Sequence, residues 1–167
     1  AANRALATPG TANSISDNQT IDIDTVVPTV LSVSSSDADG YFMAGETITI
    51  LVQLSEPVIV TGTPTLDLNS GVTAQASFDS GSGTDLLTFK YTVLAGHNSN
   101  DLDYDLTTSL TGGTILDLAD NAANRALATP GTANSISDNQ TIDIDTVVPT
   151  VLSVSSSDAD GYFMAGE

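Results

Sequence analysis

"TITILVQLS" (residues 47–55) is the stretch of this sequence that decides the fold. Ile48, Ile50, Val52 and Leu54 stand at every second position, and a period of two places them on one face of a β-strand. Other short β-branched runs, bounded by Gly, Pro, Asn or Asp, recur about every ten residues, and helix signals are nearly absent. The predicted strands are 29–35, 47–55, 58–62, 63–69, 72–78, 86–94, 113–119 and 140–145.

This pattern predicts an all-β fold, and the number and spacing of the strands favour an immunoglobulin-like β-sandwich with Greek-key connections. A closed barrel is the alternative, but it would need more regular hairpins. The run "DSGSGTD" (79–85) is expected to form an exposed hairpin loop, because Gly81 and Gly83 supply the positive φ angles that tight turns need.

The chain repeats itself: residues 1–46 are identical, letter for letter, to residues 122–167, an offset of 121 residues. A period of that length has the size of a whole domain and indicates a tandem array of self-contained units. We therefore interpret 1–24 as the C-terminal end of a preceding repeat, 25–145 as one complete repeat, and 146–167 as the start of the next. The alternative is a subunit whose terminal pieces complete its neighbours by adding a strand.

The chain is strongly acidic, with 21 Asp and Glu against 3 Lys and Arg, a net charge of −18. Such a charge disfavours nucleic acid and anionic membrane surfaces as partners. A hydrophobic fraction of 40% separates the chain from acidic disordered tails. Because the acids far outnumber the bases that could pair with them, the composition predicts bound divalent cations or a high-salt habitat.

Cysteine is absent, so neither a disulfide framework nor a thiolate metal site is possible. Small extracellular modules without disulfides need another means of stabilisation, and bound metal is the usual one. No segment approaches the roughly 20 apolar residues of a membrane span, so we expect no membrane insertion of this segment.

The run "TIDID" (141–145) suggests a metal site. Ile142 and Ile144 are expected to face inward, leaving Asp143 and Asp145 roughly 7 Å apart on the other face. Ca²⁺ takes about six to eight oxygen ligands, so the remaining ligands would come from acidic loops that meet the repeat junction. The candidate metal ligands are Asp22, Asp24, Asp37, Asp39, Glu46, Glu56, Asp101, Asp103, Asp143, Asp145, Asp158 and Asp160.

For any single aspartate the alternative is a solvated turn residue, since Asp and Asn favour turns for local hydrogen-bonding reasons. The turn "SDADGYFMAGE" (36–46) is not an EF-hand, because its Gly and Glu do not fall where that loop requires them. We expect calcium at or near the junction between repeats, with several ions per repeat possible.

Several runs of this sequence resemble, in their order, the tandem immunoglobulin-like or cadherin-like repeats of very large calcium-dependent bacterial surface adhesins of the repeats-in-toxin and biofilm-associated types. They are "DTVVPTV", "GETITILVQLSEPVIVTGTPTLDL", "SGSGTDLLTFKYTV", "DLDYD", "GGTILDLADN" and "IDIDT". The resemblance covers the whole period and is most specific over residues 45–68; the cadherin-type acidic linker is only partly matched, as "DIDT".

This resemblance implies a β-sandwich repeat of an extracellular, cell-surface protein. In that family such repeats are calcium-stiffened extenders that project a terminal ligand-binding domain in cell adhesion and biofilm formation. The ligand positions that it carries over are Asp143, Asp145, Asp103 and Glu56, with Asp22 and Asp24 as the equivalents of the first two.

Catalysis is not expected, and we predict that the chain is not an enzyme. His97 is the one histidine and stands in a loop, where a lone histidine is usually a polar turn residue; no Gly-x-Ser-x-Gly elbow is present. Paired carboxylates alone do not make a glycosidase, whose sugar cleft is lined by aromatics, and Trp is absent.

The function expected from the sequence is a structural extender of a long bacterial surface fibre, with the neighbouring identical repeats as its partners. Two alternatives remain. One is a filament or surface-layer subunit assembled by strand exchange or lateral contacts, and the other, less favoured, is a carbohydrate-binding module.

Overall fold

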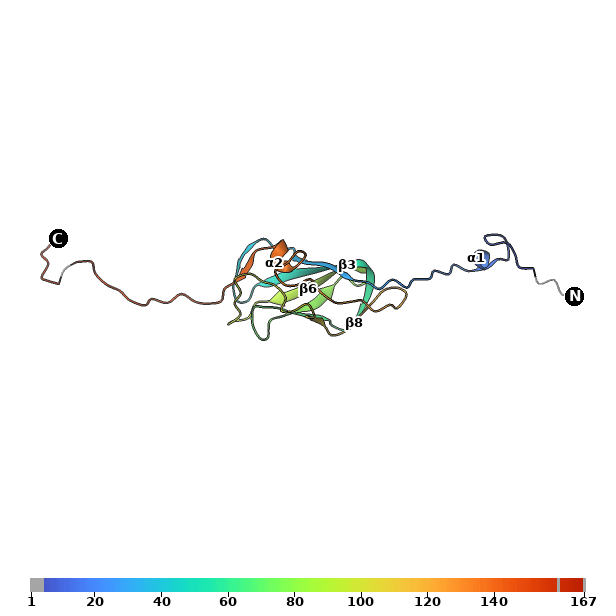
Figure 1. Cartoon of the computed structure of the whole chain (residues 1–167). Coiled ribbons are helices and arrows are strands. Elements are labelled where there is room, and N and C mark those ends of the chain that lie inside the picture. Colours follow the sequence, from blue (N-terminus) through green and yellow to red (C-terminus); the bar gives the residue numbers. More distant parts are fainter. Residues whose placement is uncertain (1–4, 159, 167) are drawn as a thin grey trace.

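β-strands make up most of the regular structure in the computed structural model, which describes residues 5–158 and 160–166 (Figure 1). The two short helices are α1 (Ile15–Asn18) and α2 (Ile136–Asn139). The strands are β1 (Val30–Ser35), β2 (Gly40–Phe42), β3 (Thr47–Thr61), β4 (Thr65–Asp67), β5 (Gln75–Ser80), β6 (Thr84–Thr92), β7 (Leu110–Thr111), β8 (Thr114–Leu116) and β9 (Ile142–Ile144). No helix within the described residues is long and apolar enough to cross a lipid bilayer.

The main sheet is antiparallel, with the strand order β1-β3-β6-β5-β4-β7. β8 pairs with the far end of β3, outside this path. A separate two-stranded parallel pair joins β2 near the start of the fold to β9 near its end, and sets Gly40 opposite Ile142. The fold is therefore all-β, and a long-range pairing brings its last strand back to its beginning.

β3 is one long strand that serves two partners. Its first part pairs with β6 as far as Gln53, opposite Leu86, and the pairing resumes only at Val58, opposite Thr84. The residues between form a bulge, which accommodates Pro57 because proline has no N–H to donate. The prediction of separate strands at 47–55 and 58–62 was wrong on this point, since β3 runs from Thr47 to Thr61 without a break and only its register shifts at the bulge.

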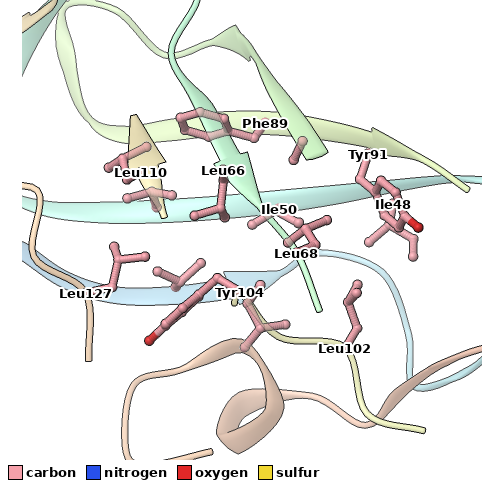
Figure 2. Close-up of a cluster of buried hydrophobic side chains, with 14 of the residues drawn as sticks. Ile48, Ile50, Leu66, Leu68, Phe89, Tyr91, Leu102, Tyr104, Leu110 and Leu127 are labelled. Carbon is pink, nitrogen blue, oxygen red and sulfur yellow. The ribbon is translucent and has the colours of Figure 1, made fainter. Parts of the chain in front are cut away.

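The core lies on the face of β3 that the alternation predicts. Ile48, Ile50, Val52 and Leu54 are all buried, which confirms the prediction. Figure 2 shows side chains of β3, β4 and β6 meeting those of Leu102, Tyr104 and Leu127, which approach from segments outside the main sheet. The hairpin loop is also confirmed, since Gly81 and Gly83 have φ angles of 105° and 91° between β5 and β6.

The chain comprises a leading segment, a body and a closing segment, with residues 25–27 joining the first two and an extended trailing part at 146–158 and 160–166. The body is residues 28–121, which contain β1 to β8. The closing segment is residues 122–145, which contain α2 and β9 and pack their apolar side chains onto the body. The leading segment is residues 5–24, the described part of the first copy of the closing-segment sequence.

Identical sequences have opposite environments in the two copies. In the closing segment Ile136 is 0% exposed and Leu127 is buried. Ile142 and Ile144 are also buried, as the alternation in "TIDID" predicts. In the leading segment the equivalent Ile15 is 73% exposed, and its companions Leu6, Ile21 and Ile23 are exposed as well. Figure 1 shows the leading segment extending away from the body, which explains the difference.

The other end of the chain repeats the contrast. Val33 of β1 is buried, whereas its equivalent in the second copy, Val154, is exposed. Residues 147–158 and 160–166 extend from the end of the body opposite to the leading segment (Figure 1). A stretch of this sequence thus becomes core only when the body that it packs against accompanies it.

Two matched substitutions test this dependence on context. Ile142→Ala removes a fully buried side chain from β9, and we expect it to lower the free energy of unfolding by about 2–5 kcal/mol. Ile21→Ala makes the same change in the same local sequence on an exposed side chain, and we expect an effect within about 0.5 kcal/mol. Urea denaturation of the two variants measures both values, and equal losses would contradict the assignment of the two environments.

Candidate metal centre

Three carboxylates converge where the chain enters the body. One oxygen from each of Asp24, Glu56 and Asp117 lies within 4.8 Å of the other two. Asp24 is the last residue of the leading segment, Glu56 lies in the bulge of β3, and Asp117 directly follows β8. Because β3 pairs with β8 just beyond its bulge, the sheet brings the last two together, and the incoming chain supplies the first.

Asp24 is held at this place by one local hydrogen bond and one hydrogen bond from a distant part of the chain. Its side chain accepts a hydrogen bond from the backbone N–H of Val26 at 2.9 Å, an Asx turn that fixes the chain direction. Its backbone carbonyl accepts a hydrogen bond from the side-chain amide of Asn121 at 3.2 Å. The same turn recurs at Asp145, which accepts from Val147 at 2.8 Å, so the turn is a property of the repeated sequence.

Asp117 is the buried member of the cluster, at 3% exposed. One carboxylate oxygen accepts hydrogen bonds from the backbone N–H groups of Ala119 (2.7 Å) and Asn121 (2.8 Å), and the other accepts from the Asn121 side chain at 2.8 Å. Burial by itself raises the pKa of Asp117, but the hydrogen bonds from Asn121 and Ala119 outweigh it and lower the pKa. The carboxylate is therefore ionised and its orientation is fixed.

The pKa of Glu56 is shifted in the opposite direction. Its Oε1 atom is buried and has no hydrogen-bond partner among the described residues. Burial, followed by the negative charges of Asp24 and Asp117, raises the pKa of Glu56 above its ordinary value. A buried, ionised oxygen without a partner is destabilising, so a positive charge placed at this cluster would stabilise it.

The bases that the structure describes have other partners. Arg125 donates to the backbone carbonyls of Gly112 and Gly113, at 2.5 and 2.9 Å. Lys90 pairs with Asp79 at 3.4 Å on the exposed surface. Arg4 lies outside the described residues.

The chemistry of the donors indicates which cation would fit. Three carboxylates and the nearby carbonyl of Asp24 are hard oxygen ligands, the set that Ca²⁺ and Mg²⁺ prefer. Ca²⁺ is the better match because it accepts irregular arrangements of six to eight oxygens, whereas Mg²⁺ demands near-octahedral geometry. Glu56 and Asp117 from the body and Asp24 from the leading segment would be the protein ligands, with water completing the set.

Of the predicted ligands, Asp24 and Glu56 are brought together here, and several others have structural hydrogen bonds instead. Asp37 accepts from the backbone N–H of Thr49 at 2.6 Å, and Glu46 accepts at 2.7 Å from a backbone N–H three residues before it. Asp39 accepts from the N–H of Thr141 at 2.9 Å and so ties the closing segment to the body. These three carboxylates therefore stabilise turns and strand contacts through hydrogen bonds.

Asp103 is an anchor for the closing segment. It is 3% exposed, and its carboxylate accepts hydrogen bonds from Gly131 N (2.9 Å), Ile136 N (3.3 Å) and Ser137 Oγ (2.7 Å), besides its neighbour Tyr104 N (2.8 Å). Four donors leave this carboxylate little capacity for a metal ion. Burial and the charge of Asp103 together raise the pKa of Tyr104 to about 12.

A second acidic neighbourhood lies beside this anchor. Burial, then the charges of Asp103 and Asp143, raises the pKa of Asp101. Asp143 Oδ1 is buried without a hydrogen-bond partner in the described part of the chain. The described residues contain no further group of three potential ligands as close together as the first cluster.

The remaining predicted ligands lie outside the cluster of Asp24, Glu56 and Asp117. Asp145 occupies its Asx turn at the exit from the body, and Asp158 accepts from Ser156 Oγ at 2.9 Å. Asp22 and Asp160 are exposed in the two extended ends of the chain.

Sequence reasoning missed Asp117 and its partner Asn121. The signal was present in "LDLADN" (116–121), where an Asp at the end of a strand precedes an Asn by four residues. An Asp at such a place often accepts from the backbone N–H two residues on, as Asp117 does from Ala119, but this preference does not reveal which other carboxylate the turn will meet.

His97 differs from the prediction of a polar turn residue, since it is only 6% exposed. Its Nδ1 lies 2.8 Å from the Tyr91 hydroxyl and its Nε2 lies 3.3 Å from Thr73 Oγ1, and its ring stacks on Tyr91. Its backbone carbonyl accepts from Thr146 Oγ1 at 3.0 Å. His97 therefore shapes the loop that holds the chain where it leaves the body.

We expect that removing the charge of Glu56 stabilises the fold at neutral pH. Since the pKa of Glu56 is raised, the folded chain binds more protons than the unfolded chain as the pH rises from 4.5 to the raised value. The contribution of Glu56 to stability therefore falls as the pH increases through that window, and at pH 7 it is unfavourable. Glu56→Gln should raise the free energy of unfolding at pH 7 in the presence of a chelator, and the gain should shrink below pH 4.5.

Glu46→Gln is the matched control, because Glu46 has a hydrogen bond and does not belong to the cluster. It should leave stability unchanged or lower it. Urea denaturation at pH 7 and pH 4 measures both variants. If Glu56→Gln lowered the free energy of unfolding at pH 7 without metal, the inferred repulsion between the carboxylate of Glu56 and those of Asp24 and Asp117 would be refuted.

Comparison with known proteins gives no relative from which a role could be transferred. No family model, curated protein or solved structure matches the chain. The function must therefore be inferred from the residues of the cluster and from the repeat that surrounds them.

Proposed function

We propose that this chain is a structural extender of a long extracellular bacterial surface fibre or adhesin, in which Ca²⁺ joins and stiffens successive units. The proposal is for a non-catalytic role. One observation carries it: three carboxylates converge, with Asp24 preceding the body and Glu56 and Asp117 belonging to it. These residues lie on the two sides of the repeat boundary that we infer from the sequence.

Because the sequence repeats exactly, the same cluster would form at every junction of a longer array. Asp24 and Asp145 are equivalent positions in the two copies, and each begins the same Asx turn. In a longer array Asp145 would meet the Glu56 and Asp117 equivalents of the next unit. Each junction would then hold one cation between the end of one unit and the body of the next.

A bound cation would act on the junction in two ways. It would neutralise carboxylates that otherwise repel one another, and it would connect the incoming chain to β3 and β8 at once. Since only a few residues separate Asp24 from the buried Pro28, fixing Asp24 also fixes the direction from which the preceding unit arrives. A string of units would behave as a rod when calcium is bound and as a flexible chain when it is removed.

The proposed unit is an immunoglobulin-like or cadherin-like β-sandwich of 121 residues. Support comes from β3, which pairs with β6 as far as Val58 and then with β8 from Ile59 to Thr61, as strands do that contribute to two sheets. Further support comes from the chain ends, which leave the body at opposite sides (Figure 1), an arrangement suited to end-to-end arrays.

Calcium titration of the full chain tests the proposal. A calcium concentration about 100 times the Kd should stabilise the fold by about 2.7 kcal/mol. Asn121→Ala removes the amide that orients Asp117 and contacts Asp24, and we expect calcium affinity to fall by about 10- to 100-fold, as for other groups that position metal ligands. Isothermal calorimetry and thermal melts measure these effects.

Asp158→Asn is the control, because it removes an exposed carboxylate that lies outside the cluster, and it should leave calcium binding unchanged. Absence of binding heat and of any rise in melting temperature would refute the proposal. Small-angle scattering of a chain with four periods, with and without chelator, tests the mechanical part. A rod that loosens on chelation is expected, and unchanged dimensions would contradict it.

A further inference from the structure

The chain leaves the body through a set of hydrogen bonds that hold it in place. The backbone of Ile144 exchanges two hydrogen bonds with that of Ser99, at 2.7 and 2.9 Å. Thr146 N donates to Asn98 Oδ1 at 3.0 Å, and the Thr146 hydroxyl donates to the carbonyl of His97 at the same distance. The exit from the body is therefore fixed as far as Thr146.

The repeated sequence that follows contains the next point of attachment. Residues 146–167 are identical to residues 25–46, so Pro149 is the equivalent of Pro28. Pro28 is buried, and its carbonyl accepts a hydrogen bond of 2.8 Å from the closing segment. In a tandem array three steps of chain would separate Thr146, held by one body, from Pro149, held by the next. Three steps span at most about 11 Å.

One residue at this junction would be bonded to both bodies. Asp145 N donates to the carbonyl of Phe42 at 3.0 Å, which attaches it to the body that the chain is leaving. Its equivalent Asp24 accepts through its backbone carbonyl from the Asn121 side chain at 3.2 Å, which attaches it to the body that the chain is entering. The two bonds are compatible, because both aspartates form the same Asx turn. Successive bodies would therefore have almost no free linker between them.

Two neighbouring turns form the exit end of the body. They are residues 43–46 and 94–98, and a backbone hydrogen bond of 2.8 Å joins the first turn to the residue that precedes the second. Met43 and Leu94 are 65% and 51% exposed, so each turn presents one large apolar side chain. Both turns lie at the exit, since the first directly follows β2 and the second contains the groups that bind Thr146.

The entry end of the body also presents apolar side chains. Hydrogen bonds to Asp117 hold the turn 117–121, in which Leu118 is 83% exposed. Pro57 in the bulge of β3 is exposed next to the same carboxylate cluster. The entry and exit ends lie on opposite sides of the body (Figure 1). In an array, the exit end of one unit would therefore face the entry end of the next.

Charge opposes contact between these two ends. The entry end carries the cluster of Asp24, Glu56 and Asp117, and in an array Asp145 of the preceding unit would take the place of Asp24. Three carboxylates with oxygens within 4.8 Å repel one another. The ends can approach when this charge is reduced, and apolar contact then favours the closed junction because it removes apolar surface from water.

We propose that successive units of the array pack directly end to end, with residues 43–46 and 94–98 of one body against Pro57 and residues 117–121 of the next. The partner of the exit end is thus the next copy of this repeat. The inference rests on the proposed function in that it takes the chain to be part of a tandem array. It goes further, because the contact sets the angle between two units, and the cation acts by removing the repulsion that keeps the ends apart.

A chain lengthened by one exact period, with two bodies, tests the contact. Leu118→Cys in the second body lies against the exit end of the first body, whereas Leu118→Cys in the first body has no body before it. The chain has no cysteine of its own, so maleimide labelling reports on this residue alone. With calcium bound, we expect labelling to be about tenfold slower in the second body than in the first, because the rate follows the fraction of open junctions.

Two further positions serve as controls. Leu94→Cys should show the reverse order, with slower labelling in the first body, because the second body follows its exit end. Ser77→Cys is exposed on β5 of the main sheet and should be labelled at the same rate in both bodies.

Measurements in chelator separate this inference from the proposed function. Chelation should abolish the difference in labelling between the two bodies. Glu56→Gln in the second body removes one of the three charges without any metal, and it should restore part of that difference in chelator. If calcium did not bind and Glu56→Gln still gave the difference, the calcium-dependent function would fail and the contact would stand.

The contact is overturned if Leu118→Cys and Leu94→Cys are each labelled at equal rates in the two bodies, both with calcium and with Glu56→Gln in chelator. That result would count against end-to-end packing even if calorimetry showed that calcium binds.

Discussion

The packing of the closing segment onto the body is the interaction on which the rest of this structure depends. The core of β3, β4 and β6 is open on one side until Leu127, Ile136, Ile142 and Ile144 cover it. Asp103 fixes the segment in place through its hydrogen bonds to the turn and to α2. A buried carboxylate that is fully satisfied by donors from another part of the chain stabilises one arrangement and penalises its loss, because an exposed core and an unpaired charge would appear together.

This dependence explains why the same sequence is buried in one copy and exposed in the other. The leading segment has the same side chains and the same local turns as the closing segment, yet its apolar face is exposed because no body lies against it. Local propensity is therefore sufficient for the small helix and its caps, and it is insufficient for burial. Burial is supplied by residues that lie up to about a hundred positions away in the sequence, such as Val33, which binds Asn139.

Charge at the entry to the body adds a second constraint. Asp117 is stabilised in its ionised form by Asn121, whereas Glu56 is destabilised by its two acidic neighbours and by burial. One carboxylate is thus held in the charged state while another close to it resists that state, and the described bases are engaged with backbone carbonyls or with Asp79. A cation bound there, as we propose, would resolve this conflict at the point where one repeat would meet the next.

The sequence by itself determined the β-class of the fold, the buried face of β3, the inward direction of Ile142 and Ile144, and the place of Asp24 and Glu56 as candidates. These features follow from alternation, repetition and charge, which are local or can be counted along the chain. Only the tertiary structure decided that β3 continues through its bulge, that His97 is buried, that Asp103 is an anchor, and that Asp117 joins the acidic cluster. Each of these depends on which distant segments the sheet brings into contact, and short-range patterns carry no information about such pairings.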